Sequence, residues 1–175
     1  MYHLINDILQ FAEVGNTEEL SVPVSSGELV ESVVRVLAPQ ENIEIEIQQP
    51  MPEVGYPPVR LKQIFQNLIV NGVRHFGKPT GKIMVSCASQ NQYWCFKVWD
   101  NGQGIHEKHF SRIFEMFQSL DRKESPDSTG IGLALVKKIV EQNGGEIQVE
   151  SEFGEYTCFS FTVPKMVEKG RRNDA

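Results

Sequence analysis

The sequence predicts a single α+β domain in which helices pack on one face of a mostly antiparallel or mixed sheet. Two observations predict this class. In some segments apolar residues recur at the spacing of an amphipathic helix, and in others they alternate with polar residues as in a half-buried strand. The length of 175 residues is also sufficient for one hydrophobic core and too short for two independent ones.

Four segments have the helical pattern. The serines at 25 and 26 provide an N-cap for the second helix, and Pro39 ends it. The sequence Asn143-Gly144-Gly145 provides a C-terminal stop for the fourth. Helices are therefore expected over about residues 3–14, 26–38, 59–76 and 129–142.

Alternation of apolar and polar residues predicts five strands. The first is Ile43–Ile47, in which isoleucines alternate with glutamates. Two hairpins are expected to supply the others, over residues 82–88 with 93–100 and over 146–151 with 156–163. Residues 16–23 are expected to form a linker and 50–58 a turn-rich connection.

Composition excludes several classes of function. The chain has 17 Lys and Arg against 23 Asp and Glu, a net charge of −6, which disfavours binding to nucleic acid. No apolar run approaches the roughly 18 residues of a membrane span, and no secretion signal is visible. Three cysteines lie far apart in apolar segments, so they are expected to be reduced residues of a cytoplasmic protein.

The helix over 59–76 has a polar row beside its apolar face. Asn71 lies at the border between the two, and Arg74 follows one turn later. Such a row fits a solvated helix face, and it also fits a site in which the Asn71 carbonyl oxygen binds Mg²⁺. That ion commonly takes one or two protein oxygens and fills its other positions with water and phosphate oxygens.

The sequence Asp100-Asn101-Gly102-Gln103-Gly104 follows the expected strand over 93–100. A β-turn explains this composition, but alternation places Asp100 on the same face as Phe96 and Val98. A carboxylate on an apolar face requires hydrogen-bond donors. The exocyclic amine of adenine is one such donor, and glycines would let the backbone approach a flat ring.

A third group of small residues opens the helix over 129–142. Ser128, Thr129, Gly130 and Gly132 fit either a plain N-cap or an anion site of exposed backbone amides. The preceding segment, 101–129, is long enough to be a lid or binding loop. Within it an apolar stripe predicts one face of a short helix, formed by Phe110, Ile113, Phe114 and Phe117.

In order and spacing, these motifs resemble those of the catalytic, ATP-binding domain of bacterial sensor histidine kinases, which has the Bergerat fold. The resemblance covers residues 24–164. Residues 61–75 resemble the N box, 100–105 the G1 box, 113–117 the F box and 129–134 the G2 box. Residues 143–147 and 157–159 also fit the pattern.

The resemblance implies a two-layer α/β sandwich with a mixed five-stranded sheet and a mobile ATP lid. It implies that Asn71 and Arg74 act in catalysis, Asn71 by holding Mg²⁺ and Arg74 by contacting phosphate. Asp100 would accept a hydrogen bond from adenine. The full set of implied ATP-binding residues is Asn67, Asn71, Arg74, His75, Asp100, Gly102, Gly104, Ile105, Phe117, Arg122, Lys123, Thr129, Gly130, Ile131, Gly132, Leu133 and Thr157.

The sequence departs from the family in three places. Gln118 stands where an Arg commonly follows the F box, which leaves Arg122 or Lys123 as the candidate phosphate contact of the lid. The second glycine of the final glycine pair is Glu155. None of the four histidines lies in the phosphoacceptor pattern.

These departures bear on domains and partners. Residues 1–16 resemble the end of a dimerisation hairpin, 22–165 would be the catalytic domain, and 166–175 a flexible tail. The expected partners are ATP, a histidine-bearing dimerisation domain of the same protein, which would be a homodimer, and a response regulator receiver domain. No contact of this chain with nucleic acid or membrane is expected.

Two alternatives remain. A related ATP-hydrolysing clamp would have a Glu general base at the position of Asn67, and an amide cannot accept a proton. A degenerate nucleotide-binding interaction module is the other alternative. The retained Asn71, Asp100 and Gly130 count against it, and the missing Arg after the F box counts for it.

Overall fold

The computed structural model describes residues 2–16, 19–37, 42–118 and 129–166. In chain order its elements are α1 (Tyr2–Glu13), β1 (Val22–Ser25), α2 (Ser26–Leu37), β2 (Ile43–Ile47), β3 (Glu53–Tyr56), α3 (Pro58–Arg74), β4 (Gly81–Gln90), β5 (Tyr93–Asp100), the 3₁₀ helix η1 (Glu107–His109), α4 (Gly132–Gln142), β6 (Ile147–Glu152) and β7 (Tyr156–Pro164).

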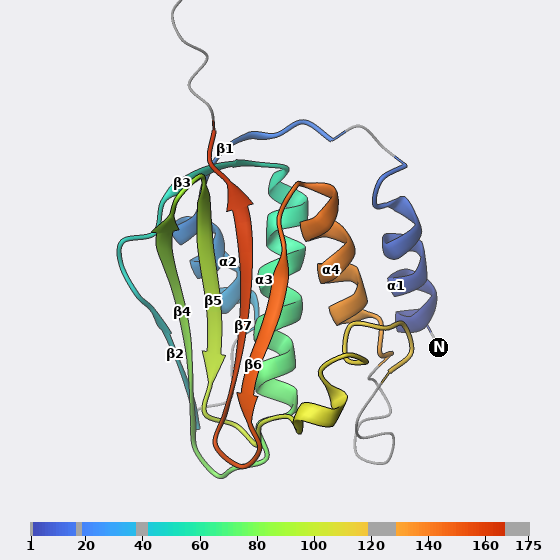
Figure 1. Cartoon of the computed structure of the whole chain (residues 1–175), viewed down its shortest axis with the longest axis vertical. Helices are drawn as coiled ribbons and strands as arrows, with labels where there is room; N and C mark the ends of the chain where they lie inside the picture. Colours follow the sequence, from blue (N-terminus) through green and yellow to red (C-terminus); the bar gives the residue numbers. More distant parts are fainter. Residues whose placement is uncertain (1, 17–18, 38–41, 119–128, 167–175) are drawn as a thin grey trace, which may run out of the picture.

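The main sheet has five strands in the order β2-β4-β5-β7-β6. β2 pairs with β4 in parallel and the other neighbours are antiparallel, so the sheet is mixed. Helices α2, α3 and α4 lie against one face of it (Figure 1). The predicted α+β class and two-layer arrangement are therefore confirmed.

The core lies between the sheet and these helices. Three phenylalanine rings from α3, β5 and β7 meet at its centre, with ring centroids 5.2 to 5.5 Å apart: Phe65, Phe96 and Phe161. All three are fully buried, as helical spacing predicts for Phe65 and alternation in β5 and β7 predicts for Phe96 and Phe161. This packing fixes α3 across the sheet and so positions the polar residues at its C-terminal end.

The structure corrects three details of the sequence prediction. The short strands β1 and β3 form an additional antiparallel pair where a linker and a turn-rich connection were expected. The stripe from Phe110 to Phe117 does not form a regular helix, because only η1 precedes a series of turns. α4 begins at Gly132 rather than at Thr129, since Gly130 has φ of +67° and cannot be helical.

Helix α1 packs beside α4 (Figure 1). Lys138 Nζ donates a hydrogen bond to the Phe11 carbonyl oxygen at 2.8 Å and lies 4.4 Å from the centre of the Phe11 ring. Val14 is 4% exposed, whereas Ile5 and Leu9 are more than half exposed. One side of α1 is therefore bound to the domain while apolar residues remain at its surface. None of the described helices is both long and apolar enough to cross a membrane.

Candidate functional site

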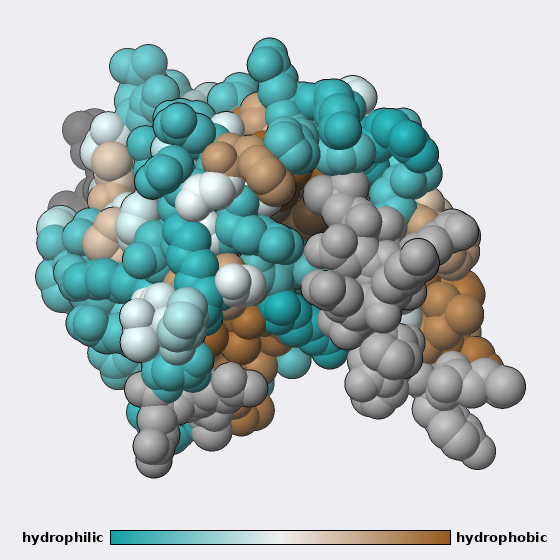
Figure 2. All heavy atoms as spheres, turned by 90° about the horizontal axis from the view of Figure 1, so that it is seen from below, coloured by the Kyte–Doolittle hydropathy of each residue, from teal (hydrophilic) through white to brown (hydrophobic). Residues whose placement is uncertain are grey.

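A cleft lies where the C-terminal half of α3, the end of β5 and the start of α4 meet. Seen from this end of the molecule, a mostly hydrophilic surface surrounds a hollow with hydrophobic residues inside (Figure 2). The lining residues of the cleft are Asp7, Asn67, Val70, Asn71, Gly72, Arg74, His75, Asp100, Gln103, Gly104, Ile105, Ile113, Gln118, Thr129, Gly130, Gly132, Leu133 and Thr157.

One end of the cleft contains the carboxylate of Asp100, the last residue of β5. The residue is 7% exposed, and one carboxylate oxygen accepts a hydrogen bond from the Gly102 amide at 2.9 Å. Burial raises the pKa of Asp100 to about 6, although the Gly102 hydrogen bond and the nearby Lys78 oppose the rise. Across the β5–β7 ladder lies Thr157, which is also buried. The structure thus provides a buried hydrogen-bond acceptor beside a small hydroxyl.

The two glycines after Asp100 allow the chain to turn tightly at this end. A Cβ on Gly102 would lie 2.6 Å from the Asp100 carboxylate and 3.2 Å from the backbone oxygen of Phe76. Gly104 has φ of +69°, and its Cβ would lie 2.1 Å from the backbone oxygen of Glu152. Neither position accepts a side chain without displacing backbone or the carboxylate.

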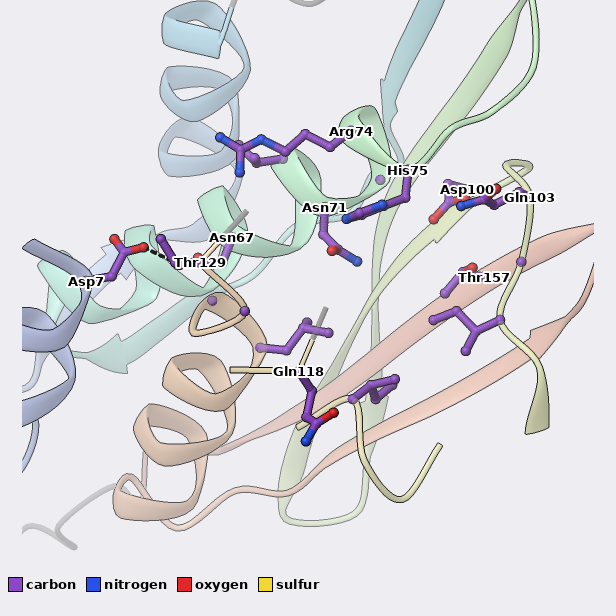
Figure 3. Close-up of a pocket in the computed structure, with 18 residues that line it drawn as sticks. Asp7, Asn67, Asn71, Arg74, His75, Asp100, Gln103, Gln118, Thr129 and Thr157 are labelled. Carbon is purple, nitrogen blue, oxygen red and sulfur yellow. Dashed lines mark hydrogen bonds between the residues drawn. The ribbon is translucent and has the colours of Figure 1, made fainter. Parts of the chain in front are cut away.

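The long side of the cleft is formed by α3. Asn71 projects toward the cleft, and Arg74 lies one turn later at its rim (Figure 3). Arg74 is exposed, and none of the ion pairs among the described residues involves it. An amide oxygen therefore points into the cleft, and a positive charge lies at its rim.

The opposite end is the start of α4. Gly130 takes the left-handed conformation and its carbonyl oxygen accepts a hydrogen bond from the Phe117 amide at 2.9 Å, which ties this turn to the end of the segment after η1. Ile131, at the helix N-cap position, has no side-chain cap. The first amides of α4 therefore face the cleft as potential donors to an anion.

Most of the predicted ATP-binding residues line this cleft. Three do not: Gly102, whose amide bonds the Asp100 carboxylate; Phe117, which is 49% exposed; and Ile131, which is fully buried in the core. Two more, Arg122 and Lys123, lie outside the described residues. The expected contact of the lid with phosphate therefore also lies outside the described residues. Of the predicted tail over 166–175, only residue 166 is described.

Six lining residues were not predicted. Val70 and Gly72 are neighbours of Asn71, Ile113 lies in the predicted F box, and Gln118 was noted only for its place after that box. Gln103 lies within the predicted Asp100–Gly104 segment. Asp7 is different, because it comes from α1 and its Oδ2 accepts a hydrogen bond from Thr129 Oγ1 at 2.6 Å. No local sequence pattern connects two residues so far apart in the chain.

The fold defines a two-layer domain of the ATPase class, with a mixed five-stranded sheet covered by helices on one face. A family model described as "Histidine kinase-, DNA gyrase B-, and HSP90-like ATPase" matches residues 56–167. The chain belongs to this family.

Its relatives include phytochrome-like proteins and histidine kinases. It is 38% identical to the phytochrome-like protein Cph1 of Synechocystis sp., over 94% of this chain and 22% of the relative. Identity to the circadian input-output histidine kinase CikA of Synechococcus elongatus is 30%, over 94% of this chain and 23% of the relative. The chain thus spans less than a quarter of the length of these relatives.

Solved structures of histidine kinases have the same fold. Full-length ShkA in complex with AMPPNP superposes with a TM-score of 0.78 at 30% identity, over 92% of this chain and 35% of that one. The nucleotide-free catalytic domain of histidine kinase ThkA superposes with a TM-score of 0.70 at 27% identity, over 83% of this chain and 95% of that one. The fold is therefore that of histidine kinase catalytic domains.

Proposed function

We propose that this chain is the ATP-binding catalytic domain of a sensor histidine kinase. It would transfer the γ-phosphate of ATP to a histidine on a dimerisation domain, for relay to an aspartate of a response regulator. The observation that carries this proposal is the polarity of the cleft. A buried acceptor lies at one end, and an amide oxygen, a cation and the free amides of a helix start lie along the rest.

Each end of the cleft suits one part of ATP. The Asp100 carboxylate would accept a hydrogen bond from the exocyclic amine of adenine, with Gly102 and Gly104 keeping the backbone close to the ring. Backbone amides from Gly130 to Leu133 would bind phosphate oxygens, as anions bind at helix N-termini. Arg74 would add a charge-assisted hydrogen bond to phosphate.

We propose Asn71 as the protein ligand of Mg²⁺. Its amide oxygen is a hard donor directed into the cleft, and Mg²⁺ needs few protein ligands when phosphates and water supply the rest. Among the described residues no group of three acidic, histidine or cysteine side chains is placed to bind a metal. This fits an ion that arrives with ATP. When bound, it would neutralise the charge of the phosphates during transfer.

Phosphoryl transfer requires positioning and charge neutralisation more than covalent participation by the protein. Asn67, one helical turn before Asn71, carries no group that accepts a proton, and its amide donates to the Gln63 carbonyl oxygen at 2.8 Å. The cleft therefore has no base at this position to activate water. This favours transfer to a histidine, which is itself the nucleophile, over hydrolysis.

We propose further that residues 22–165 form the catalytic domain and that residues 1–16 are the end of the dimerisation hairpin. The exposed apolar side chains of α1, among them Ile5 and Leu9, support this division. In Figure 2 hydrophobic atoms gather at the right edge, on the side of α1. A face of this kind fits a helix that packs against others in a dimer.

Calorimetric titration of ATP, with and without Mg²⁺, tests the proposal. Wild type should bind ATP, and binding should weaken without Mg²⁺, in Asn71→Ala and in Asp100→Asn. Gln92→Ala, in the turn after β4 and away from the cleft, should bind as wild type does. A histidine-bearing hairpin added with labelled ATP should then acquire phosphate. Failure of the intact chain to bind any nucleotide would favour the degenerate interaction module. The presence of Gln118 where an Arg is expected supports that alternative.

A further inference from the structure

The phosphate end of the cleft already contains a carboxylate of the chain itself. Asp7, on α1, lines the cleft, and its Oδ2 accepts the 2.6 Å hydrogen bond from Thr129 Oγ1 (Figure 3). Thr129 is three residues before the first residue of α4, at the start of the turn whose amides would bind phosphate. A negative charge from one element therefore lies where another element offers donors to an anion.

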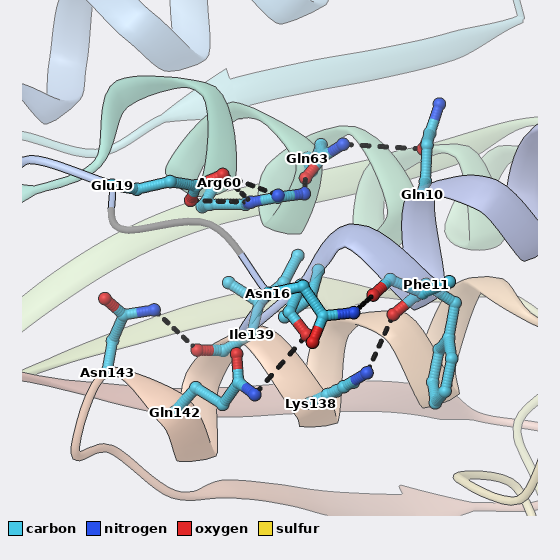
Figure 4. A network of polar contacts seen from close by, with 12 residues as sticks. Gln10, Phe11, Asn16, Glu19, Arg60, Gln63, Lys138, Ile139, Gln142 and Asn143 are labelled. Carbon is cyan, nitrogen blue, oxygen red and sulfur yellow. Dashed lines mark hydrogen bonds and ion pairs between the residues drawn. The ribbon is translucent and has the colours of Figure 1, made fainter.

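This contact is the first of a row that runs along one side of α1. The Phe11 carbonyl oxygen accepts a hydrogen bond from Lys138, whose ammonium group also lies over the Phe11 ring (Figure 4). The Val14 carbonyl oxygen accepts a hydrogen bond from Gln142 at 3.5 Å. Asp7, Phe11 and Val14 follow helical spacing, and their partners advance in the same direction, from Thr129 just before α4 to Lys138 and Gln142 on it. The carboxylate is thus held in the cleft by the docking of the whole helix.

The docked helix is held by these polar contacts and by limited apolar packing. Phe11 packs partly buried against the core and Val14, just after the end of α1, is buried, while Leu4, Ile5, Ile8 and Leu9 are each at least 38% exposed. Exchange of protein hydrogen bonds for water costs only about 1 kcal/mol each. Release of α1 is therefore within reach of the binding energy of a ligand.

We propose that α1 is an internal latch that competes with the phosphates of ATP. In the docked state the Asp7 carboxylate holds the hydroxyl of Thr129 in a hydrogen bond, and its negative charge repels the triphosphate. Phosphate binding at the start of α4 displaces Asp7 and releases α1, with Phe11 and Val14, from the side of α4. The inference rests on the proposed function, since it names a regulator of the same nucleotide site.

The latch works in both directions. If release of α1 strengthens ATP binding by some factor, ATP weakens the docking of α1 by the same factor, because the two binding equilibria are linked. Whatever chain is attached to α1 then senses whether the cleft holds a triphosphate. Conversely, a pull on α1 changes the affinity of the cleft for ATP.

The first test compares Asp7→Asn with Glu13→Gln. Both remove one negative charge from α1, but Glu13 is exposed and does not line the cleft. Calorimetry should show ATP binding to Asp7→Asn roughly tenfold more tightly than to wild type, within the usual range of couplings between sites. Adenosine, which lacks phosphates, should bind all three proteins equally. Glu13→Gln should match wild type for both ligands.

A second pair separates the latch from a local charge effect. Lys138→Ala removes the contacts of Phe11, and Lys137→Ala removes the same charge from the neighbouring residue, which pairs with Glu141 instead. Lys138→Ala should bind ATP more tightly than Lys137→Ala does, because it frees α1 and Asp7 with it. Equal affinities for this pair would overturn the latch.

A readout without nucleotide keeps the two proposals distinguishable. Amide hydrogen exchange over residues 2–14 should be faster in Asp7→Asn than in Glu13→Gln. Unchanged exchange, or weaker ATP binding by Asp7→Asn, would overturn the latch, and the weaker binding would instead make Asp7 a participant in binding. If no variant binds nucleotide while exchange responds as expected, the proposed function fails and the docking contact stands.

Discussion

The side-chain oxygen of Asn67 lies 2.7 Å from the position that a Cβ on Gly132 would occupy. This relationship joins α3 to the first residue of α4 with no space for a methyl group. The two helices that line the cleft are therefore in contact at the phosphate end, and a side chain at residue 132 must displace the Asn67 amide, which is held by its hydrogen bond to the Gln63 carbonyl oxygen.

Gly132→Ala tests this contact. Alanine favours a helix over glycine by up to about 1 kcal/mol, so an ordinary site would be stabilised. Here we expect destabilisation by about 1–3 kcal/mol from overpacking, together with weaker ATP binding. Urea denaturation measures the first effect, and the double variant Asn67→Ala/Gly132→Ala should recover most of the loss. A Gly132→Ala protein more stable than wild type would show that the Asn67 side chain moves aside without loss of stability.

We expect the ionisation of Asp100 to have opposite effects on the stability of the fold and on the affinity for ATP. Burial raises its pKa from 3.8 in the unfolded chain to about 6 in the folded one. The stabilising contribution of this group is therefore present below about pH 4 and is lost as the pH rises through about 6. At pH 7 Asp100→Asn, which has no charge to bury, should be more stable than wild type by on the order of 2 kcal/mol.

ATP binding should change in the other direction. The ionised carboxylate is the better acceptor for adenine, so wild-type affinity should fall as the pH drops below about 6, and Asp100→Asn should bind weakly at every pH. Urea unfolding and calorimetry at pH 4.5 and 7.5 measure both effects. A wild-type affinity that does not vary between these pH values would contradict the assigned role.

Arg74 should act on phosphate alone. Removal of a charge-assisted hydrogen bond costs about 1.5–3 kcal/mol, but exposure and salt reduce this at the rim. We expect Arg74→Ala to weaken ATP binding roughly tenfold and to leave adenosine binding unchanged. Lys62→Ala, an exposed residue on the same helix, is the matched control. Equal losses for ATP and adenosine would place Arg74 in a structural role instead.

The ion pair between Arg60 and Glu19 lies away from the cleft, and we expect its loss to destabilise the fold. Arg60 is 5% exposed, and its Nε lies 2.7 and 2.8 Å from the two Glu19 oxygens (Figure 4). Glu19→Ala leaves a buried cation without its partner, so it should cost about 3 kcal/mol. Thermal and urea unfolding measure this loss, with Glu31→Ala on the exposed side of α2 as the control. A cost below that of Glu31→Ala would mean that water replaces the carboxylate.

The regular elements could be predicted because their patterns are local. Alternation identified β4, β5 and β7, and helical spacing identified α3 and α4. β1 and β3 have four residues each and are stabilised by pairing with one another across α2, a non-local contact that has no local pattern. The stripe over 110–117 misled because Ile113 and Phe114 pack on the core without a regular helix, and Phe117, at φ of +63°, turns back toward Gly130.

The candidate site divides in the same way. Asp100, Asn71 and Gly130 belong to short motifs that are readable in one stretch of sequence, and the fold brings them to one cleft. Asp7 could not be predicted as a cleft residue, because its position depends on how α1 docks on α4. A carboxylate on an amphipathic helix resembles any solvated charge until the tertiary structure is known.

The ion pair of Glu19 with Arg60 also limits how far a released α1 can travel. Only four peptide units separate Gly15, after the end of α1, from Glu19, which corresponds to a reach of at most about 14 Å. The helix therefore stays tethered beside its own domain at a high effective concentration. Return to the docked position is an intramolecular event whose frequency does not depend on protein concentration, so each chain resets independently after its nucleotide leaves.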